Sequence, residues 1–153
     1  MTKRKNWIKL VSYLIFSVIL PILLIEFSII DISKIIALGN DFHYNVISLS
    51  AISAGFLFTG ISILISTLEK KRIERLWKNN YLDNLYRAAI IGIIFNILTV
   101  ITSIVILICK IGTQIYRILV YFELILLIAS LLFFIWCLIK LISLISKLKE
   151  SNN

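Results

Sequence analysis

Two carboxylates stand inside long apolar runs of this sequence, where they could carry proton or cation chemistry. Glu26 lies near the end of the first run, and Glu123 lies near the start of the last. An acid within a membrane segment is costly, so it is a functional candidate by default. The alternative is that each acid reaches the membrane surface or pairs with Lys34, Lys110 or Arg117. The two acids are therefore candidate sites whose environment depends on the helices that hold them.

The apolar runs have the length of membrane-spanning helices. Hydrophobic residues make up 60% of the 153 residues, and the mean hydropathy is +1.01, which is more apolar surface than a small soluble domain can bury. A helix needs about 20 apolar residues to cross the hydrocarbon, whereas barrel strands would be shorter and alternating. The predicted spans are residues 7–30, 45–68, 88–109 and 115–139. The sequence therefore predicts an all-α integral membrane protein, a four-helix transmembrane bundle that forms one domain over residues 1–153.

The first and last runs carry additional features. The first run follows basic residues, but it is too long for a signal peptide and no small-residue cleavage site follows it, so we expect an uncleaved span. Pro21 inside this span predicts a kink. The last run can continue as one helix from residue 115 to residue 149, which is longer than a bilayer requires. We expect this helix either to tilt or to emerge from the membrane.

Positive charge is distributed unevenly along the chain. Three of the 16 Lys and Arg residues lie in or beside the predicted connections 31–44 and 110–114; they are Lys34, Lys110 and Arg117. The remaining thirteen lie toward the two ends of the chain and in the connection 69–87. Cytoplasmic segments of membrane proteins carry an excess of Lys and Arg. Both termini and the 69–87 loop are therefore predicted to be cytoplasmic.

The 69–87 loop carries an apolar and aromatic pattern as well as charge. Apolar residues recur at three- and four-residue spacings, and Asn80 followed by Asp83 is typical of a helix start. The second helix is predicted to continue to about Lys78 and the third to begin near Tyr81, which makes an extended cytoplasmic hairpin tip. Interface anchoring on anionic lipid explains such a tip, and so does docking of a cytoplasmic partner protein; we expect no nucleic-acid contact by this chain. The candidate docking residues are Lys71, Arg72, Arg75, Trp77, Lys78 and Tyr81.

Small and polar residues share one helical face in each of the two middle spans. In the second span they are Ser48, Ala51, Gly55, Thr59, Ser62 and Ser66, and in the third they are Ala88, Gly92, Asn96, Thr99 and Ser103. Small residues at every fourth position allow membrane helices to approach closely, within a subunit or in a homo-oligomer. The alternative is that such a face lines a polar path or pore. Asn96 is the most polar member, and its amide needs a partner in hydrocarbon.

Other reactive residue types do not form a recognisable centre. Cys109 and Cys137 are placed in opposite leaflets, so they cannot form a disulfide within one chain. His43 falls in the first external loop, in GNDFHYN, where we expect it to be solvated. No metal-spaced cluster, phosphate loop or nucleophile elbow is present in the sequence. We therefore predict no catalytic residue, no metal, no cofactor and no enzymatic activity.

The stretch SLSAISAGFLFTGISILISTLEKKRIERLW, residues 48–77, resembles the second span and following loop of the membrane subunit of Kiwa-type bacterial anti-phage defence systems. The resemblance rests on a span rich in Gly and Phe that is followed by an extended basic helix. It implies a homo-oligomeric four-helix subunit in the bacterial cytoplasmic (inner) membrane, with both termini inside. It also implies a cytoplasmic protein that docks on the intracellular face.

Three functional hypotheses follow from the sequence. The first is a non-enzymatic membrane sensor or anchor that oligomerises and docks a cytoplasmic partner on its basic inner face, in anti-phage defence. The second is a small oligomeric ion channel or transporter lined by the polar faces. The third is a membrane protein of the bacteriocin-immunity type, in which the external loops would matter more than the tip.

Overall fold

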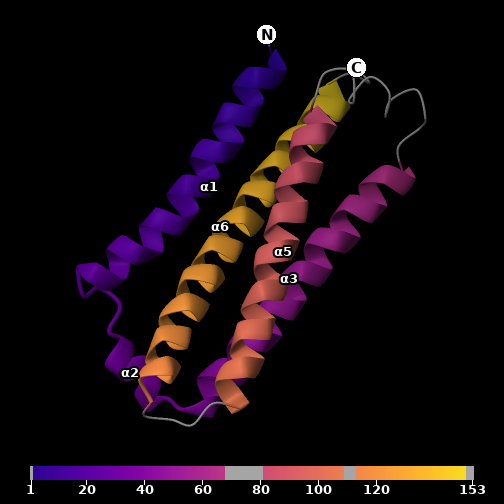
Figure 1. Ribbon diagram of the computed structural model, residues 1–153. Helices are drawn as coiled ribbons and strands as arrows, with labels where there is room; N and C mark the ends of the chain where they lie inside the picture. Colours follow the sequence, from indigo (N-terminus) through magenta and orange to yellow (C-terminus); the bar gives the residue numbers. More distant parts are fainter. Residues whose placement is uncertain (1, 68–80, 109–112, 151–153) are drawn as a thin grey trace.

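The computed structural model describes residues 2–67, 81–108 and 113–150, and the regular elements in these ranges are all α-helices (Figure 1). In chain order they are α1 (Thr2–Glu26), α2 (Ile32–Ala37), α3 (Asn40–Thr67), α5 (Tyr81–Ile108) and α6 (Gln114–Glu150). Four of them, all but α2, are long and apolar enough to cross a membrane. The prediction of an all-helical protein with four candidate spans is confirmed, and it indicates a multi-pass membrane protein.

The four long helices lie alongside one another and alternate in direction (Figure 1). α5 packs against both α3 and α6, while α1 packs mainly against α6. α1 begins and α6 ends at one end of the bundle, which we call the terminal end. α2 lies at the opposite end, which we call the α2 end.

The first connection differs from the prediction because two backbone turns shift it toward the N-terminus, from residues 31–44 to residues 27–39. α1 ends at Glu26 rather than at residue 30, since Ser28 adopts a left-handed conformation with φ of 56° that turns the chain. The side chain of Asp31 then caps α2 by accepting a hydrogen bond of 3.0 Å from the amide of Ser33. Gly39, with φ of +66°, follows the end of α2 and reverses the chain.

α3 consequently begins at Asn40 rather than at residue 45, and Asp41 in its first turn favours that start. Most of the predicted external loop is therefore helical, as α2 and the first turn of α3. This is the largest difference between the predicted and observed element boundaries.

The last two helices agree with the prediction. α5 begins at Tyr81, and α6 runs without a break from Gln114 to Glu150. Its 37 residues span roughly 55 Å at 1.5 Å per residue, against a hydrocarbon core of about 30 Å. The candidate docking residues before Tyr81 lie outside the described residues, so the hairpin tip stays a prediction.

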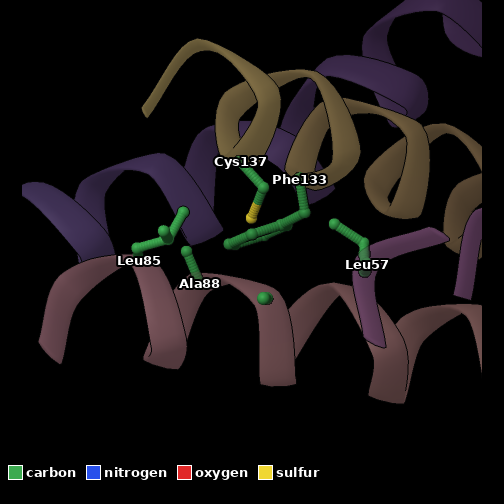
Figure 2. Close-up of a cluster of buried hydrophobic side chains, with 6 residues drawn as sticks. Leu57, Leu85, Ala88, Phe133 and Cys137 are labelled. Atoms are coloured by element: carbon green, nitrogen blue, oxygen red, sulfur yellow. The ribbon is translucent and has the colours of Figure 1, made fainter. Parts of the chain in front are cut away.

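Two apolar clusters hold the described helices together at different heights. The terminal cluster consists of Leu57, Leu85, Ala88, Ala89, Phe133 and Cys137, and the α2-end cluster of Ile32, Ile106, Tyr116, Val120 and Leu124. Figure 2 shows Phe133 and Cys137 of α6 on the side of Leu85 and Ala88 of α5, with the side chain of Leu57 of α3 pointing toward Phe133. A Cβ atom on Gly92 would lie 3.0 Å from Leu57 Cδ1 and 3.3 Å from Phe133 Cβ, so glycine permits this close three-helix contact.

Tyr13 attaches α1 to α6. Its hydroxyl donates a hydrogen bond of 2.8 Å to the carbonyl of Leu132, and its ring lies edge-on to Phe133 with centroids 5.4 Å apart. Large apolar side chains remain exposed on the outside of all four long helices, including Trp7, Ile52, Ile101 and Ile142. Such a surface is satisfied by contact with lipid chains.

Candidate functional site

His43 belongs to the first turns of α3 and its side chain is fully buried. The prediction that it is solvated in an external loop is therefore wrong, because Gly39 starts the helix before it. The rings of His43 and Phe42 lie 5.5 Å apart in an edge-on arrangement. His43 thus points into the bundle at the α2 end.

Glu123 of α6 is the partner of His43. The distance from His43 Nδ1 to Glu123 Oε2 is 2.8 Å, and the exposed fraction of both side chains is zero. The expectation that Glu123 reaches the surface or pairs with Lys34 or Arg117 is wrong, because the approach of α3 to α6 supplies a buried partner instead. Both of these cations are exposed.

Two hydroxyl groups complete the network. The Tyr116 hydroxyl of α6 lies 3.1 Å from His43 Nε2, and the Ser103 hydroxyl of α5 is hydrogen-bonded to Glu123 Oε1. Ser103 Oγ also lies 3.0 Å from the carbonyl oxygen of Thr99, one turn earlier in α5. Three helices therefore contribute to one continuous set of hydrogen bonds, which we call the His43–Glu123 network.

The His43–Glu123 network can be satisfied in more than one protonation state. When Glu123 is ionised, Ser103 donates to its Oε1 atom and an imidazole N–H donates to Oε2. When Glu123 carries a proton on Oε1, it donates to Ser103, whose own hydroxyl then donates to the carbonyl of Thr99. Tyr116 can likewise donate to a neutral His43 or accept from a charged one. The network thus offers hydrogen-bond partners to both carboxylate oxygens and both imidazole nitrogens in more than one protonation state.

The surroundings of the network determine its charge. Apolar side chains of the α2-end cluster pack around it, including Ile106 and Leu124. An isolated charge is very unfavourable in such a medium, whereas a His–Glu pair that shares one proton is neutral overall. The state with one titratable proton on the pair therefore carries no net charge, whereas gain or loss of a proton creates a net buried charge.

The polar face predicted for the third span lies inside the bundle, next to this network. Ala88, Gly92, Asn96, Thr99 and Ser103 are all buried. The Asn96 amide donates a hydrogen bond of 2.8 Å to the carbonyl of Gly92, and Thr99 bonds to the carbonyl of Phe95. Asn96 Oδ1 and Ser50 Oγ are buried without a hydrogen-bond partner among the described residues. This face forms a polar track that leads from the network toward the middle of the bundle.

The polar face predicted for the second span lies on the outside instead. Ser48, Ala51, Gly55, Thr59, Ser62 and Ser66 are all exposed. The hydroxyls of Thr59 and Ser62 each donate a hydrogen bond of 2.8 Å to a carbonyl of α3 itself, so they do not require another helix. The two faces therefore do not meet within one chain.

The other candidate residues lie elsewhere. Glu26 is exposed at the end of α1, so the two acids have different environments. Cys137 is buried in the terminal cluster, while Cys109 and most candidate docking residues fall outside the described ranges. The described residues contain no group of three or more His, Cys, Asp or Glu side chains that could hold a metal ion.

The sequence does contain a signal for the burial of His43. His43, Val46, Ser50, Ser53 and Leu57 are all buried and recur at spacings of three and four residues, which extends the inner face of α3 back to His43. Ser103 belongs to the face predicted for the third span. The sequence around His43 and around Glu123 does not indicate that the two side chains meet, because their approach depends on how α3 and α6 pack.

The fold and site together define a multi-pass helical membrane protein with a buried histidine–glutamate network near one end of its bundle. No protein-family model, curated protein or solved structure matches the chain.

Proposed function

We propose that this protein is a non-enzymatic membrane sensor, that the His43–Glu123 network is its sensing element, and that the proton is the ligand it senses. The observation that carries the proposal is the complete burial of an ionisable pair between α3 and α6. Buried ionic groups in membrane proteins are costly and mark sites of proton or ion chemistry. A change in the charge of this pair changes the free energy of the contact between the two helices.

A sensing role fits this site better than a catalytic role. A catalytic pair needs space beside it for a substrate. His43, Ser103, Tyr116 and Glu123 are each at most 1% exposed, and they already occupy one another's hydrogen-bonding positions. A proton needs no such space, since it moves along existing hydrogen bonds.

The output of the sensor is proposed to be its basic end. α1 begins and α6 ends at the terminal end (Figure 1). Most of the Lys and Arg residues lie toward the two ends of the sequence and in the segment 69–87. By the positive-inside rule this end faces the cytoplasm. We propose that a cytoplasmic partner docks there through the basic segment that contains Arg75 and Trp77, and that the setting is the anti-phage defence suggested by residues 48–77.

The sensing proposal is tested by hydrogen–deuterium exchange on the purified protein in a mild detergent. Exchange is compared at about pH 5 and about pH 8, the range in which histidine changes charge, after correction for the intrinsic pH dependence. We expect protection of α2 and the first turns of α3 to depend on pH in the wild type and not in Glu123→Gln. Glu26→Gln is the matched control and should behave as the wild type. An equal response in Glu123→Gln would overturn the proposal.

The docking proposal is tested by co-purification from the native membrane. Arg75→Ala and Trp77→Ala should release a co-purifying cytoplasmic protein while the amount of inserted protein stays unchanged. Lys34→Ala, which removes an exposed cation at the α2 end, is the control and should retain the partner. Retention of the partner by all three variants would contradict docking at the basic segment.

An oligomeric channel is a second candidate because of the outer face of α3. A Cβ atom added to Gly55 would meet no neighbouring side chain or helix within 4 Å, so this face can accept another helix closely. A pore of this kind would form between subunits. Ion flux in liposomes that depends on Thr59 would support the channel, and flux that is absent or insensitive to Thr59→Val would exclude it.

A further inference from the structure

We propose that the His43–Glu123 network exchanges its proton only with the α2 end of the bundle and that Tyr116 is the relay between the network and solvent. This inference rests on the proposed sensing function and adds the side of the membrane that is sensed. With the terminal end in the cytoplasm, the protein would respond to the pH outside the cell.

The open side of the site is defined by Tyr116. Its hydroxyl lies 3.1 Å from His43 Nε2, and the residue also lines an open surface depression of about 440 Å³. The depression lies at the start of α6 and beside α2. Its other lining residues are Ile36, Thr113, Gln114, Arg117, Ile118 and Tyr121. The hydroxyl of Tyr116 contacts the network, and the residue, although only 1% exposed, forms part of the wall of this hollow.

The closed side of the site is the terminal cluster (Figure 2). Phe133 is fully buried there, and a methyl group on Gly92 would lie 3.0 Å from Leu57 Cδ1 and 3.3 Å from Phe133 Cβ, so these neighbours would have to shift to admit it. A proton moves along hydrogen-bonding groups or water, and a close-packed apolar layer supplies neither. Transfer from the network toward the terminal end is therefore blocked within the subunit.

The polar track between these two regions sets the limit of proton movement. It continues from Ser103 through Thr99 to Asn96, whose Oδ1 atom is buried without a hydrogen-bond partner among the described residues. The track reaches the level of Gly92, where the terminal cluster begins. The arrangement is a half-path: it admits a proton from the α2 end and offers no continuation beyond the cluster.

The transfer step conserves atoms and charge. A hydronium ion in the depression gives a proton to the Tyr116 oxygen while the Tyr116 hydroxyl proton passes to His43 Nε2. Tyr116 is thus neutral before and after the step. The His43 Nδ1 proton can then pass to Glu123 Oε2 along the 2.8 Å hydrogen bond. The network carries a net negative charge before the step and is neutral after it, and the hydronium ion has become water.

Other ionisable groups at this end of the bundle face away from the pair. They are Glu26 of α1, Asp31 and Lys34 of α2, Asp41 and Tyr44 of α3, and Arg117 and Tyr121 of α6, and all are exposed. The charged or titratable residues of α5 all belong to the terminal end of that helix; they are Tyr81, Asp83, Tyr86 and Arg87. Solvent screens these groups from the buried pair, so the pair and Tyr116 dominate the response.

The experiment separates the two sides of the membrane. Full-length protein is reconstituted in liposomes, and vesicles with the terminal end outward are isolated through a tag on the N-terminus. The infrared band of a carboxyl group, assigned to Glu123 by its loss in Glu123→Gln, reports protonation. Acidifying the bath alone should leave the band unchanged, and equilibrating the lumen with a protonophore should then produce the change.

Each outcome is decisive. A prompt response to bath pH without protonophore overturns access from the α2 end but leaves the sensing function intact. No response on either side overturns both proposals. Tyr116→Phe should reach the same endpoint as the wild type on the order of a hundredfold more slowly, because it keeps the ring and removes the relay. Tyr121→Phe, which alters the same depression away from His43, is the control; unchanged kinetics in Tyr116→Phe would overturn the relay.

Discussion

The Nδ1 atom of His43 lies 2.8 Å from the Oε2 atom of Glu123, although 80 positions separate the two residues in the chain. This contact joins the first turns of α3 to α6 across the interior of the bundle. It converts two residues that would each be costly in a membrane into one neutral unit that shares a proton. The stability of the bundle should therefore depend on keeping the two residues together.

Removing one member of the pair should cost more than removing both. Glu123→Leu and His43→Leu each leave the other group buried and unpaired, so each should lower the free energy of unfolding by about 3 kcal/mol. The double substitution leaves two apolar side chains of similar size and should be more stable than either single variant. Unfolding in mixed micelles measures all three. Additive effects of the two substitutions would contradict a direct interaction.

Ser103 should contribute through Glu123 rather than through its own helix. Ser103→Ala removes the hydroxyl that bonds to Glu123 Oε1 and should destabilise the protein by about 1–2 kcal/mol. Ser62→Ala is the control, because that residue is exposed and its hydroxyl bonds to the carbonyl of Phe58 in its own helix. The same unfolding assay compares them. If the two substitutions lower the free energy of unfolding equally, the Ser103–Glu123 hydrogen bond does not contribute more to stability than a hydrogen bond within one helix.

Gly92 and Gly55 should respond in opposite ways to a methyl group. Gly92→Ala places a Cβ atom 3.3 Å from Phe133 Cβ, which cannot move without α6, and should cost about 1–3 kcal/mol. Gly55 faces open space, so Gly55→Ala should be neutral or stabilising by up to about 1 kcal/mol. Thermal unfolding in detergent distinguishes them. A tolerated Gly92→Ala would mean that α5 and α6 are not held at this distance.

Tyr13 should control the attachment of α1. Tyr13→Phe removes the 2.8 Å hydrogen bond to the carbonyl of Leu132 but keeps the aromatic contacts, and it should cost about 1 kcal/mol. The loss should appear as faster hydrogen exchange in α1 than in α5. Uniform changes across both helices would show that α1 is not an independently held element.

The orientation of the bundle is tested by topology reporters. Reporters at residue 75 and at the C-terminus should both be cytoplasmic, because the described helices alternate in direction and their Lys and Arg residues other than Lys34 and Arg117 lie toward the terminal end. A reporter placed at the start of α2 should be on the other side. An external reporter at residue 75 would reverse the side on which the half-path opens.

The helical class, the four candidate spans and the long final helix could all be predicted from the amino-acid sequence. Apolar runs of sufficient length must form helices in a membrane, since lipid offers no partner for backbone groups. The inner face of α5, including Asn96 and Ser103, was also predictable as a face, because small and polar residues recur there at helical spacing. These features depend on local composition and periodicity.

Which polar groups meet could not be predicted in this way, because it depends on tertiary packing. The left-handed turn at Gly39 moved His43 from an expected loop into α3, and the packing of α3 against α6 brought it to Glu123. The similar small-residue faces of α3 and α5 also lie in different environments: the α3 face is exposed on the outside of the bundle, and the α5 face is buried inside it. Helical spacing identifies which residues share one side of a helix, but it does not show which helix or solvent that side contacts. That depends on which helices pack together and in what register.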